Sequence, residues 1–499
     1  MLKRNTQINR CLLVVGMVIT LLLSQTGFSL AQEIDPGAPL TPAAVEDQLP
    51  VYLPAISRPA PAPLPAPPQS VRVNAPFYDG GTHFSDAAIF WLGEVTPSEN
   101  YADVRVYYTP EALFVRVSVF DRLLYSDNTP SATELLDWDA VSVMLDLENA
   151  GSAPGTNTYR FDVQVNNQPT NMENFRASFR GNGTNWALAA VDFNGVAGFR
   201  WESSTVGGIN TGLNNRGWQA SYVIPFTSLG LPGAPLEGTM WKLGVAVHDR
   251  ESLQQASQDV NSWPSNLDAN TPTSWGELRY GLPQYSPPAS PEVGTLTVRN
   301  GLNGTHVQDA AVGGTIGNLC PGDPVYIWNY WGNANYGDDP SFNVQNQADL
   351  ADWPCFSKYF INFPLNQMLP GKVILHAELT VYLFGNSDPN YAQDTLVQIL
   401  AIDSPWDENT ITWNNAPMAA ENVSQVFVLP SDYPWPRIPY TFDVTRAVAQ
   451  VYANQTSLNL ALYSADGAPH SGKYFVGADD VYVNGDFYRP TLEITWGDP

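Results

Sequence analysis

Residues 135–146, LLDWDAVSVMLD, and residues 402–417, IDSPWDENTITWNNAP, are the most informative stretches of this 499-residue chain. In the first, Val141, Val143 and Leu145 recur at every second position, which is the period of a β-strand with one buried face. The same period continues outward through both halves of the chain, at 113–119, 159–165, 222–226, 241–247, 359–363, 379–383, 397–401, 458–462 and 492–496.

Gly, Asn and Pro separate these segments, and only one short helix is expected, at about 444–453. Strands joined by turns, with almost no helix, are typical of sandwiches and barrels. We therefore predict an all-β fold of two tandem antiparallel β-sandwich domains, jelly-roll-like in architecture. Each half has about 210 residues, which is enough for a core of its own.

The N-terminus predicts export. Lys3, Arg4 and Arg10 precede the apolar run from Leu12 to Leu23, and Ser29-Leu30-Ala31 is a small-residue cleavage site. The apolar run is short for a membrane span, so we expect cleavage and a secreted, extracellular or cell-surface protein; an uncleaved anchor is the alternative. The predicted parts are a signal peptide at 1–31, a Pro-rich linker at 32–70, a first sandwich at 71–282, a short linker at 283–293 and a second sandwich at 294–499.

The formal net charge is −26. A protein this acidic is not drawn to nucleic acid by its overall field, and we expect no nucleic-acid partner and no membrane insertion of the mature chain. The mature cysteines are Cys320 and Cys355, for which one disulfide is the simple prediction in an oxidising compartment.

Phrases in residues 71–282 resemble the family-9 carbohydrate-binding modules and their DOMON-like relatives. The phrases are ALFVRVSVFD at 112–121, WDAVSVMLD at 138–146, YRFDVQ at 159–164, GWQASYVIP at 217–225 and PTSWGEL at 272–278. The resemblance implies a β-sandwich that stacks sugars on aromatic rings. The stacking residues it implies are Trp138 and Trp263.

The strand at 159–164 supplies two candidate partners for sugar hydroxyls. Arg160 and Gln164 alternate away from Tyr159 and Phe161, so they belong to the polar face of that strand. A pyranose ring presents an apolar face to an aromatic plane, while Arg and Gln donate planar hydrogen bonds. The structural alternatives are that Trp138 is a core anchor and that Arg160 pairs with Asp162 or Asp146. For Trp275, the core is the favoured interpretation.

Residues 294–499 resemble the DNRLRE domain, a module also classed among carbohydrate-binding families. WDENTITWNNAP at 406–417 is the most specific phrase, supported by KYFINF at 358–363, AELTVYL at 377–383 and RPTLEITW at 489–496. Some relatives are associated with acidic polysaccharides. Residues 283–499 carry 7 Lys and Arg against 22 Asp and Glu, so a neutral glycan is the better expectation.

The tryptophans of the second half have two interpretations. Thr410 to Trp413 alternates as a strand, which favours a core position for Trp413, and Asp407, Glu408 and Asn409 are expected to set a turn. Trp328, Tyr330, Trp331 and Tyr336 lie among Asn and Gly, which form loops rather than buried strands, so some of these rings are expected to reach solvent. Ligand binding at this surface is nevertheless the weaker alternative to a structural role.

Calcium is a candidate structural ion, because oxygen ligands are plentiful. The candidate pairs are Asp338-Asp339, Asp479-Asp480 and Asp137 with Asp139, although an acidic pair is more often a solvated loop. The sequence contains neither an HExxH nor a GxSxG phrase, and no spacing selects two carboxylates for hydrolysis.

We therefore predict a secreted, non-catalytic protein that binds a polysaccharide or cell-surface glycan. The alternatives are a cell-surface structural or adhesion protein without a functional sugar site, and an enzyme that the motifs do not disclose.

Overall fold

The computed structural model describes residues 71–499 except 149–150, 167–171, 200–206, 255–258, 315–327, 347–355, 389, 432–435, 454–456, 469 and 482–486. The predicted signal peptide, the predicted Pro-rich linker, Cys320 and Cys355 lie outside the described residues. Within the described part of the chain, no helix is both long enough and apolar enough to cross a membrane.

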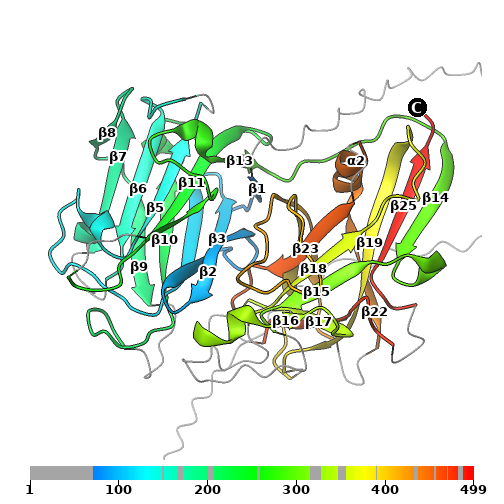
Figure 1. Cartoon of the computed structure of the whole chain (residues 1–499). Coiled ribbons are helices and arrows are strands. Elements are labelled where there is room, and N and C mark those ends of the chain that lie inside the picture. The colour runs from blue at the N-terminus through cyan, green and yellow to red at the C-terminus, as the bar shows by residue number, and fades with distance from the viewer. Residues whose placement is uncertain are drawn as a thin grey trace, which may run out of the picture. The chain divides into compact units, whose positions relative to one another are not determined.

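The described residues form three β-sheets (Figure 1), so the prediction of an all-β sandwich fold is confirmed. Sheet B has five strands in the order β2 (Ala88–Thr96), β3 (Glu99–Tyr108), β4 (Ala112–Phe120), β10 (Trp218–Pro225) and β9 (Asn194–Phe199). Sheet C contains β14 (Glu292–Arg299), β25 (Thr491–Gly497), β19 (Val373–Asn386), β24 (Lys473–Val476) and β17 (Ser341–Val344), with β22 (Ile438–Asp443) paired to β19.

Sheet A has fourteen strands and runs through both halves of the chain. Its first half contains β1 (Arg72–Ala75), β13 (Gly276–Tyr280), β11 (Met240–Asp249), β5 (Ala140–Asp146), β6 (Thr158–Gln164), β7 (Arg176–Gly181) and β8 (Trp186–Leu188), with β12 (Asp259–Trp263) paired to β11. Its second half contains β21 (Glu421–Val428), β20 (Thr395–Ala401), β23 (Leu458–Ser464), β18 (Lys358–Phe363), β15 (Gln308–Val312) and β16 (Asn335–Tyr336). Neighbouring strands are antiparallel except where β1 runs parallel to β13 and β21.

The helical elements are few. The α-helix α2 (Thr445–Ala453) confirms the helix expected at about 444–453. Short 3₁₀ turns occur at η1 (Leu135–Asp137), η2 (Met172–Phe175), η3 (Phe226–Leu229), η4 (Pro272–Ser274), η5 (Leu302–Gly304) and η6 (Trp331–Asn333).

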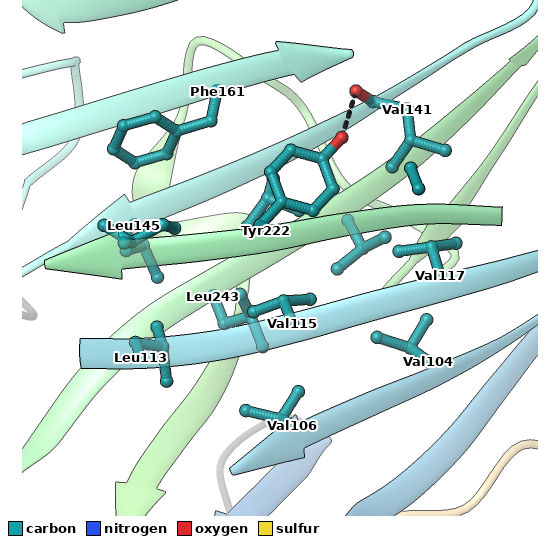
Figure 2. Packing of buried hydrophobic residues seen from close by; sticks show 14 of the residues in the cluster. Val104, Val106, Leu113, Val115, Val117, Val141, Leu145, Phe161, Tyr222 and Leu243 are labelled. Carbon is teal, nitrogen blue, oxygen red and sulfur yellow. Dashed lines mark hydrogen bonds between the residues drawn. The ribbon is translucent and has the colours of Figure 1, made fainter. Parts of the chain in front are cut away.

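The first sandwich is sheet B facing the first half of sheet A. Its core is filled by the period-two residues of both sheets, including Val104 and Val106 of β3, Leu113, Val115 and Val117 of β4, and Val141 and Leu145 of β5 (Figure 2). Tyr222 of β10 crosses this core, and its hydroxyl donates a 2.7 Å hydrogen bond to the carbonyl oxygen of Val141 in the opposite sheet. A buried Tyr hydroxyl needs such a partner, and this bond fixes the two sheets against each other.

The second sandwich is sheet C facing the second half of sheet A. Its core takes alternate residues of the long strand β19, Ala377, Leu379, Val381 and Leu383, together with the apolar face of α2. The strand alternation seen in the sequence therefore has the same structural cause in both halves: one face of each strand is buried in a sandwich core.

A third core joins the outer face of sheet B to the second sandwich. In β2, Phe90 and Leu92 belong to the core of the first sandwich, whereas Ile89 and Trp91 belong to the third core. The second sandwich contributes residues that include Phe360, Trp413 and Tyr463. Both faces of the first part of β2 are covered, and its first five residues, AIFWL at 88–92, are accordingly all apolar.

Lys358 lies within this third core without any exposed surface. Its Nζ is 3.8 Å from the ring centroid of Trp413, 3.9 Å from that of Trp91, 4.8 Å from that of Tyr101 and 5.1 Å from that of Tyr463. Burial holds the pKa of Lys358 well below its ordinary value, and the charge of Asp103 opposes that shift. The cage combines rings of both sandwiches, so it fixes their contact.

Candidate functional site

Trp138 is the predicted stacking residue that reaches solvent. It directly follows η1 and precedes β5, and its side chain is half-buried. The guanidinium of Arg250 lies over the Trp138 ring, with Cζ 3.7 Å from the centroid. A cation on one face leaves the opposite face as the one on which a sugar ring could stack.

Arg250 is held in place by the backbone around it. Its Nη1 donates to the carbonyl oxygen of Asp137 at 2.9 Å, and its Nε and Nη2 donate to the carbonyl oxygens of Ser252 and Leu253, both at 2.8 Å. The side chain is buried and its position is fixed by three hydrogen bonds. Trp138 therefore rests on a rigid support.

Three buried carboxylates lie directly behind this pair. Asp121 follows β4, Asp139 precedes β5 and Asp249 ends β11, and their side-chain oxygens lie within 4.8 Å of one another. We call Asp121, Asp139 and Asp249 the first triad. Since β11 pairs with β5 and puts His248 opposite Ala140, Asp249 and Asp139 come from neighbouring strand ends, and Asp121 comes from the facing sheet.

The first triad has hydrogen bonds, but they do not balance its charge. Asp139 accepts from the backbone N–H of Tyr125 at 2.5 Å and from that of Arg250 at 2.7 Å, and Asp121 accepts from the N–H of Leu123 at 3.0 Å. The second oxygen of Asp121, Oδ2, is buried and accepts no hydrogen bond from the described residues. Burial, and then repulsion from the neighbouring carboxylates, raises the pKa of both Asp121 and Asp139 well above the ordinary value.

This arrangement fits a divalent cation. Calcium binds oxygen ligands at about 2.3–2.6 Å, so oxygens on opposite sides of the ion are up to about 5 Å apart, which matches the spacing of the first triad. A bound ion would satisfy the buried Oδ2 of Asp121, which accepts no hydrogen bond from the described residues.

A second triad occurs in the second sandwich. Asp309 of β15, Glu408 of the 402–417 stretch and Asp479, which follows β24, also place oxygens within 4.8 Å of one another. Asp309 Oδ2 accepts from the Tyr359 hydroxyl at 2.7 Å and from the Ala478 N–H at 3.0 Å, whereas its buried Oδ1 accepts none from the described residues. Burial raises the pKa of all three carboxyls, most strongly that of Asp309.

The second triad is more open than the first. Asp479 is half-buried, and the exposed imidazole of His306 places Nε2 3.4 Å from an oxygen of Glu408. Asp338, of the predicted pair Asp338-Asp339, adds a repulsive charge near Glu408 and Asp479. Of the six residues in the predicted acidic pairs, Asp139 and Asp479 enter a triad, while Asp137 is exposed at the surface.

Two predicted binding residues are buried, and the predictions for them are wrong. Trp263 is 1% exposed, and its ring lies 4.1 Å from that of Phe90 inside the first core. The cause is register: Trp263 on β12 pairs with Val245 on β11, so both side chains point to the core face. No sugar can stack on this ring.

Gln164 lies on the expected face of β6, but the segment around Ser126 covers it. Its Nε2 donates to Ser126 Oγ at 2.7 Å and to the carbonyl oxygen of Asp127 at 3.0 Å, and the side chain has no exposed surface. Its role is to hold that segment.

Arg160 pairs with Asp162, which is the structural alternative to sugar binding. Its Nε lies 3.1 Å from an oxygen of Asp162, and its guanidinium lies over the rings of Phe179 and Trp186, with Cζ 4.1 and 5.5 Å from the centroids. Burial raises the pKa of Asp162 to about 6 although Arg160 opposes the shift. The side chain of Arg160 is 17% exposed, so its edge still borders the surface beside half-buried Trp186.

The other predicted aromatic positions are mostly in cores. Trp275, Trp328, Trp331 and Trp413 are buried, while Tyr330 is 64% exposed. Residues 410–413 form turns and irregular structure, so the prediction of a strand there is wrong. The turn expected at Asp407 is confirmed, because its carbonyl oxygen accepts from the N–H groups of Thr410 and Ile411.

The sequence did not single out Trp186, Arg250, Asp121 or Asp249 for binding. Asp121 directly follows an apolar strand, VSVFD at 117–121, and Asp249 ends another, VAVHD at 245–249; this shared pattern was the available signal.

Residues 318–474 match the model of carbohydrate-binding module family 96. They lie within the half for which a carbohydrate-binding module was predicted. Two structures of family-9 carbohydrate-binding modules from Caldicellulosiruptor kristjanssonii, in complex with cellotriose and with glucose, are 16% and 15% identical to the chain, each with a TM-score of 0.29, and cover 43% of it and 95% and 97% of their own chains.

A crystal structure of a putative carbohydrate-binding protein from Bacteroides uniformis is 14% identical, with a TM-score of 0.28, and covers 42% of this chain and 99% of its own. No curated protein matches the chain.

Proposed function

We propose that this chain is a secreted, non-catalytic protein that binds a polysaccharide or cell-surface glycan, with Trp138 as the stacking ring of its first sandwich. The observation that carries the proposal is the Trp138–Arg250 pair, an aromatic ring at the surface whose one face is covered by a fixed guanidinium. The match of residues 318–474 to a carbohydrate-binding family supports it from the other half of the chain.

Calcium is part of this proposal. The first triad would hold the ion through Asp121, Asp139 and Asp249, and the second through Asp309, Glu408 and Asp479. Trp138 directly precedes Asp139, and Arg250 directly follows Asp249. An ion between the two aspartates would therefore fix the backbone on both sides of the stacking pair.

The DNRLRE-like and DOMON-like assignments belong to the same proposal and rest on the sequence phrases. Each phrase also contains residues of a candidate site. WDAVSVMLD at 138–146 contains Trp138 and one ligand of the first triad, and WDENTITWNNAP at 406–417 contains Glu408 of the second triad.

A structural or adhesion role is the second candidate, favoured by the burial of eight tryptophans of the described residues in cores: Trp91, Trp218, Trp241, Trp263, Trp275, Trp328, Trp331 and Trp413. A glycan array probed with the full mature chain in calcium separates the two. Binding of a neutral glycan by the native protein, lost in Trp138→Ala and kept in Tyr330→Ala, supports the proposal. Absence of binding across a broad array contradicts it and favours the structural role.

A further inference from the structure

A cavity of about 210 Å³ lies between the outer face of sheet B and residues 465–468 of the second sandwich. Its polar lining consists of Ser85, Arg105, Arg116, Ser118 and Gln219, and Phe84 forms an apolar wall. No acidic side chain lines this cavity among the described residues, although the whole protein has a net charge of −26.

The two arginines face each other without a counter-charge. Arg105 of β3 and Arg116 of β4 are directly opposite in the antiparallel register, a placement that destabilises a sheet when the charges are alike. Neither takes part in any ion pair found among the described residues.

Three carboxylates flank the lining residues in sequence and are engaged with other groups: Asp86, next to Ser85, has an oxygen 3.7 Å from His83 Nδ1. Asp103, two residues before Arg105, accepts from Tyr101, Tyr463 and Asn346. Asp466, beside the lining residue Ala465, accepts from the Thr395 hydroxyl and the Ala468 N–H. None of these carboxylates forms an ion pair with Arg105 or Arg116, so neither arginine has a direct counter-ion among the described residues.

Both guanidinium groups are held rigidly. Arg105 Nε donates to the carbonyl oxygen of Ala465 at 2.8 Å, and its Nη1 lies 3.2 Å from Ser118 Oγ. Arg116 Nε donates to Ser221 Oγ at 3.0 Å, and its Cζ lies 3.7 Å from the ring centroid of Phe84. Burial and the charge of Arg105 lower the pKa of Arg116 to about 10, so it remains a cation at neutral pH. Its terminal amino groups donate to no acceptor among the described residues.

We propose that this cavity binds an oxyanion, specifically the carboxylate of an acidic sugar residue or of a smaller acid. A fixed guanidinium matches a carboxylate with two parallel hydrogen bonds, and a bound anion would offset the repulsion between Arg105 and Arg116. The volume is below the range of about 300–1,000 Å³ found for larger ligands, so a single sugar residue fits better than a chain. This site is separate from Trp138 and does not depend on the proposed function.

Calorimetric titration at constant ionic strength tests the proposal with four probes: sodium glucuronate, glucose, sodium acetate and sodium sulfate. We expect saturable binding of glucuronate and none of glucose at the same concentrations. Arg116→Gln should weaken glucuronate binding at least tenfold, whereas Arg180→Gln, a matched change at an exposed arginine on β7, should leave the affinity unchanged.

The probes distinguish the source of the anionic group. If acetate or sulfate binds as tightly as glucuronate, the result also supports an oxyanion site, and it shows that the sugar ring contributes nothing to the affinity. Absence of saturable binding for all three anions overturns the proposal, as does unchanged affinity in Arg116→Gln.

Folding of the variant is checked by near-ultraviolet circular dichroism. Removing one of two facing like charges should not lower the melting temperature. Should Arg116→Gln fail to fold, Arg116→Lys keeps the charge without the planar fork, and an affinity equal to that of the native protein would contradict the proposal.

Discussion

The two carboxylate triads use similar residues in different surroundings. The first triad is buried behind Trp138 and Arg250, at a surface where a ligand could bind. The second triad includes Glu408, whose loop carries Ile411 and Trp413 into the core between the two sandwiches. An ion at the first would therefore order a binding surface, whereas an ion at the second would order an internal contact.

The tryptophan beside each triad shows the same division. Trp138 is half-buried and contacts Arg250, while Trp413 is 2% exposed and its ring is 5.0 Å from that of Tyr101 and 4.6 Å from that of Trp331. A specific sequence phrase can therefore identify a domain without showing whether its aromatic residue binds a ligand or fills a core.

The largest effect is expected for Trp413→Ala. Removing a fully buried tryptophan costs about 3–5 kcal/mol, because the cavity it leaves cannot close fully. Scanning calorimetry should show a lower melting temperature, with the two sandwiches unfolding separately, and sugar binding at Trp138 should survive in the folded variant. A change below about 1 kcal/mol would show that the core between the sandwiches contributes little.

The next largest effect is expected for calcium itself. An ion present at 100 times its dissociation constant adds about 2.7 kcal/mol to the free energy of unfolding. Asp121→Asn should remove the part of this gain that comes from the first triad, and Glu408→Gln the part that comes from the second. Without calcium, Asp121→Asn should melt above the native protein, since an amide avoids the cost of either a charge or a retained proton on this buried carboxyl.

The two variants together decide whether the triads act separately. If Asp121→Asn and Glu408→Gln each leave the calcium-dependent rise in melting temperature untouched, neither triad binds the ion. If their effects add in the double variant, the two sites are independent.

A smaller effect is expected from pH. The raised pKa of Asp121 and Asp139 means that, without calcium, the folded state keeps protons that the unfolded state releases above about pH 4. The free energy of unfolding should then fall as pH rises, by roughly 1.4 kcal/mol for each unit by which one pKa is raised. Calcium binds the ionised carboxylates, so in its presence the free energy of unfolding should no longer decrease as pH rises.

Melting curves from pH 5 to 8, recorded in chelator and in calcium, measure this difference. In chelator, the melting temperature of Asp121→Asn should depend less on pH than that of the native protein. If the melting temperature of the native protein depends on pH no more strongly in chelator than in calcium, the pKa values of Asp121 and Asp139 are not raised in the folded state.

The smallest effect on stability is expected for Trp138→Ala. A half-buried ring at the surface contributes little to folding, so the free energy of unfolding should change by less than about 1 kcal/mol while sugar binding is lost. Tryptophan fluorescence titrated with a soluble neutral oligosaccharide, together with calorimetry, checks both halves of the statement. A loss of several kcal/mol would identify Trp138 as a structural anchor.

Much of the fold could be predicted from the sequence because strand alternation reports burial directly. The period-two residues of β4, β5 and β6 do fill the first core, and α2 lies where its helical pattern predicts. The third core was not predicted, since alternation cannot show that the outer face of a sheet is covered as well.

The candidate site could be predicted only in part. Trp263 was named as a stacking residue through the family resemblance alone, and its burial is decided by the pairing of β12 with β11, which a five-residue strand does not reveal in the sequence. Gln164 lies on the expected face, but the segment that covers it is 38 residues away in sequence. Asp121, Asp139 and Asp249 come together only through the packing of two sheets, so no local spacing could reveal them.

An oligosaccharide titration of the full chain with and without calcium, using a glycan selected on the array, tests most directly whether an ion at the first triad orders the Trp138 surface. Chelation should abolish binding, and added calcium should restore it in the native protein and in Glu408→Gln, but not in Asp121→Asn. Equal affinity in chelator and in calcium would contradict the claim that the first triad orders the Trp138 surface.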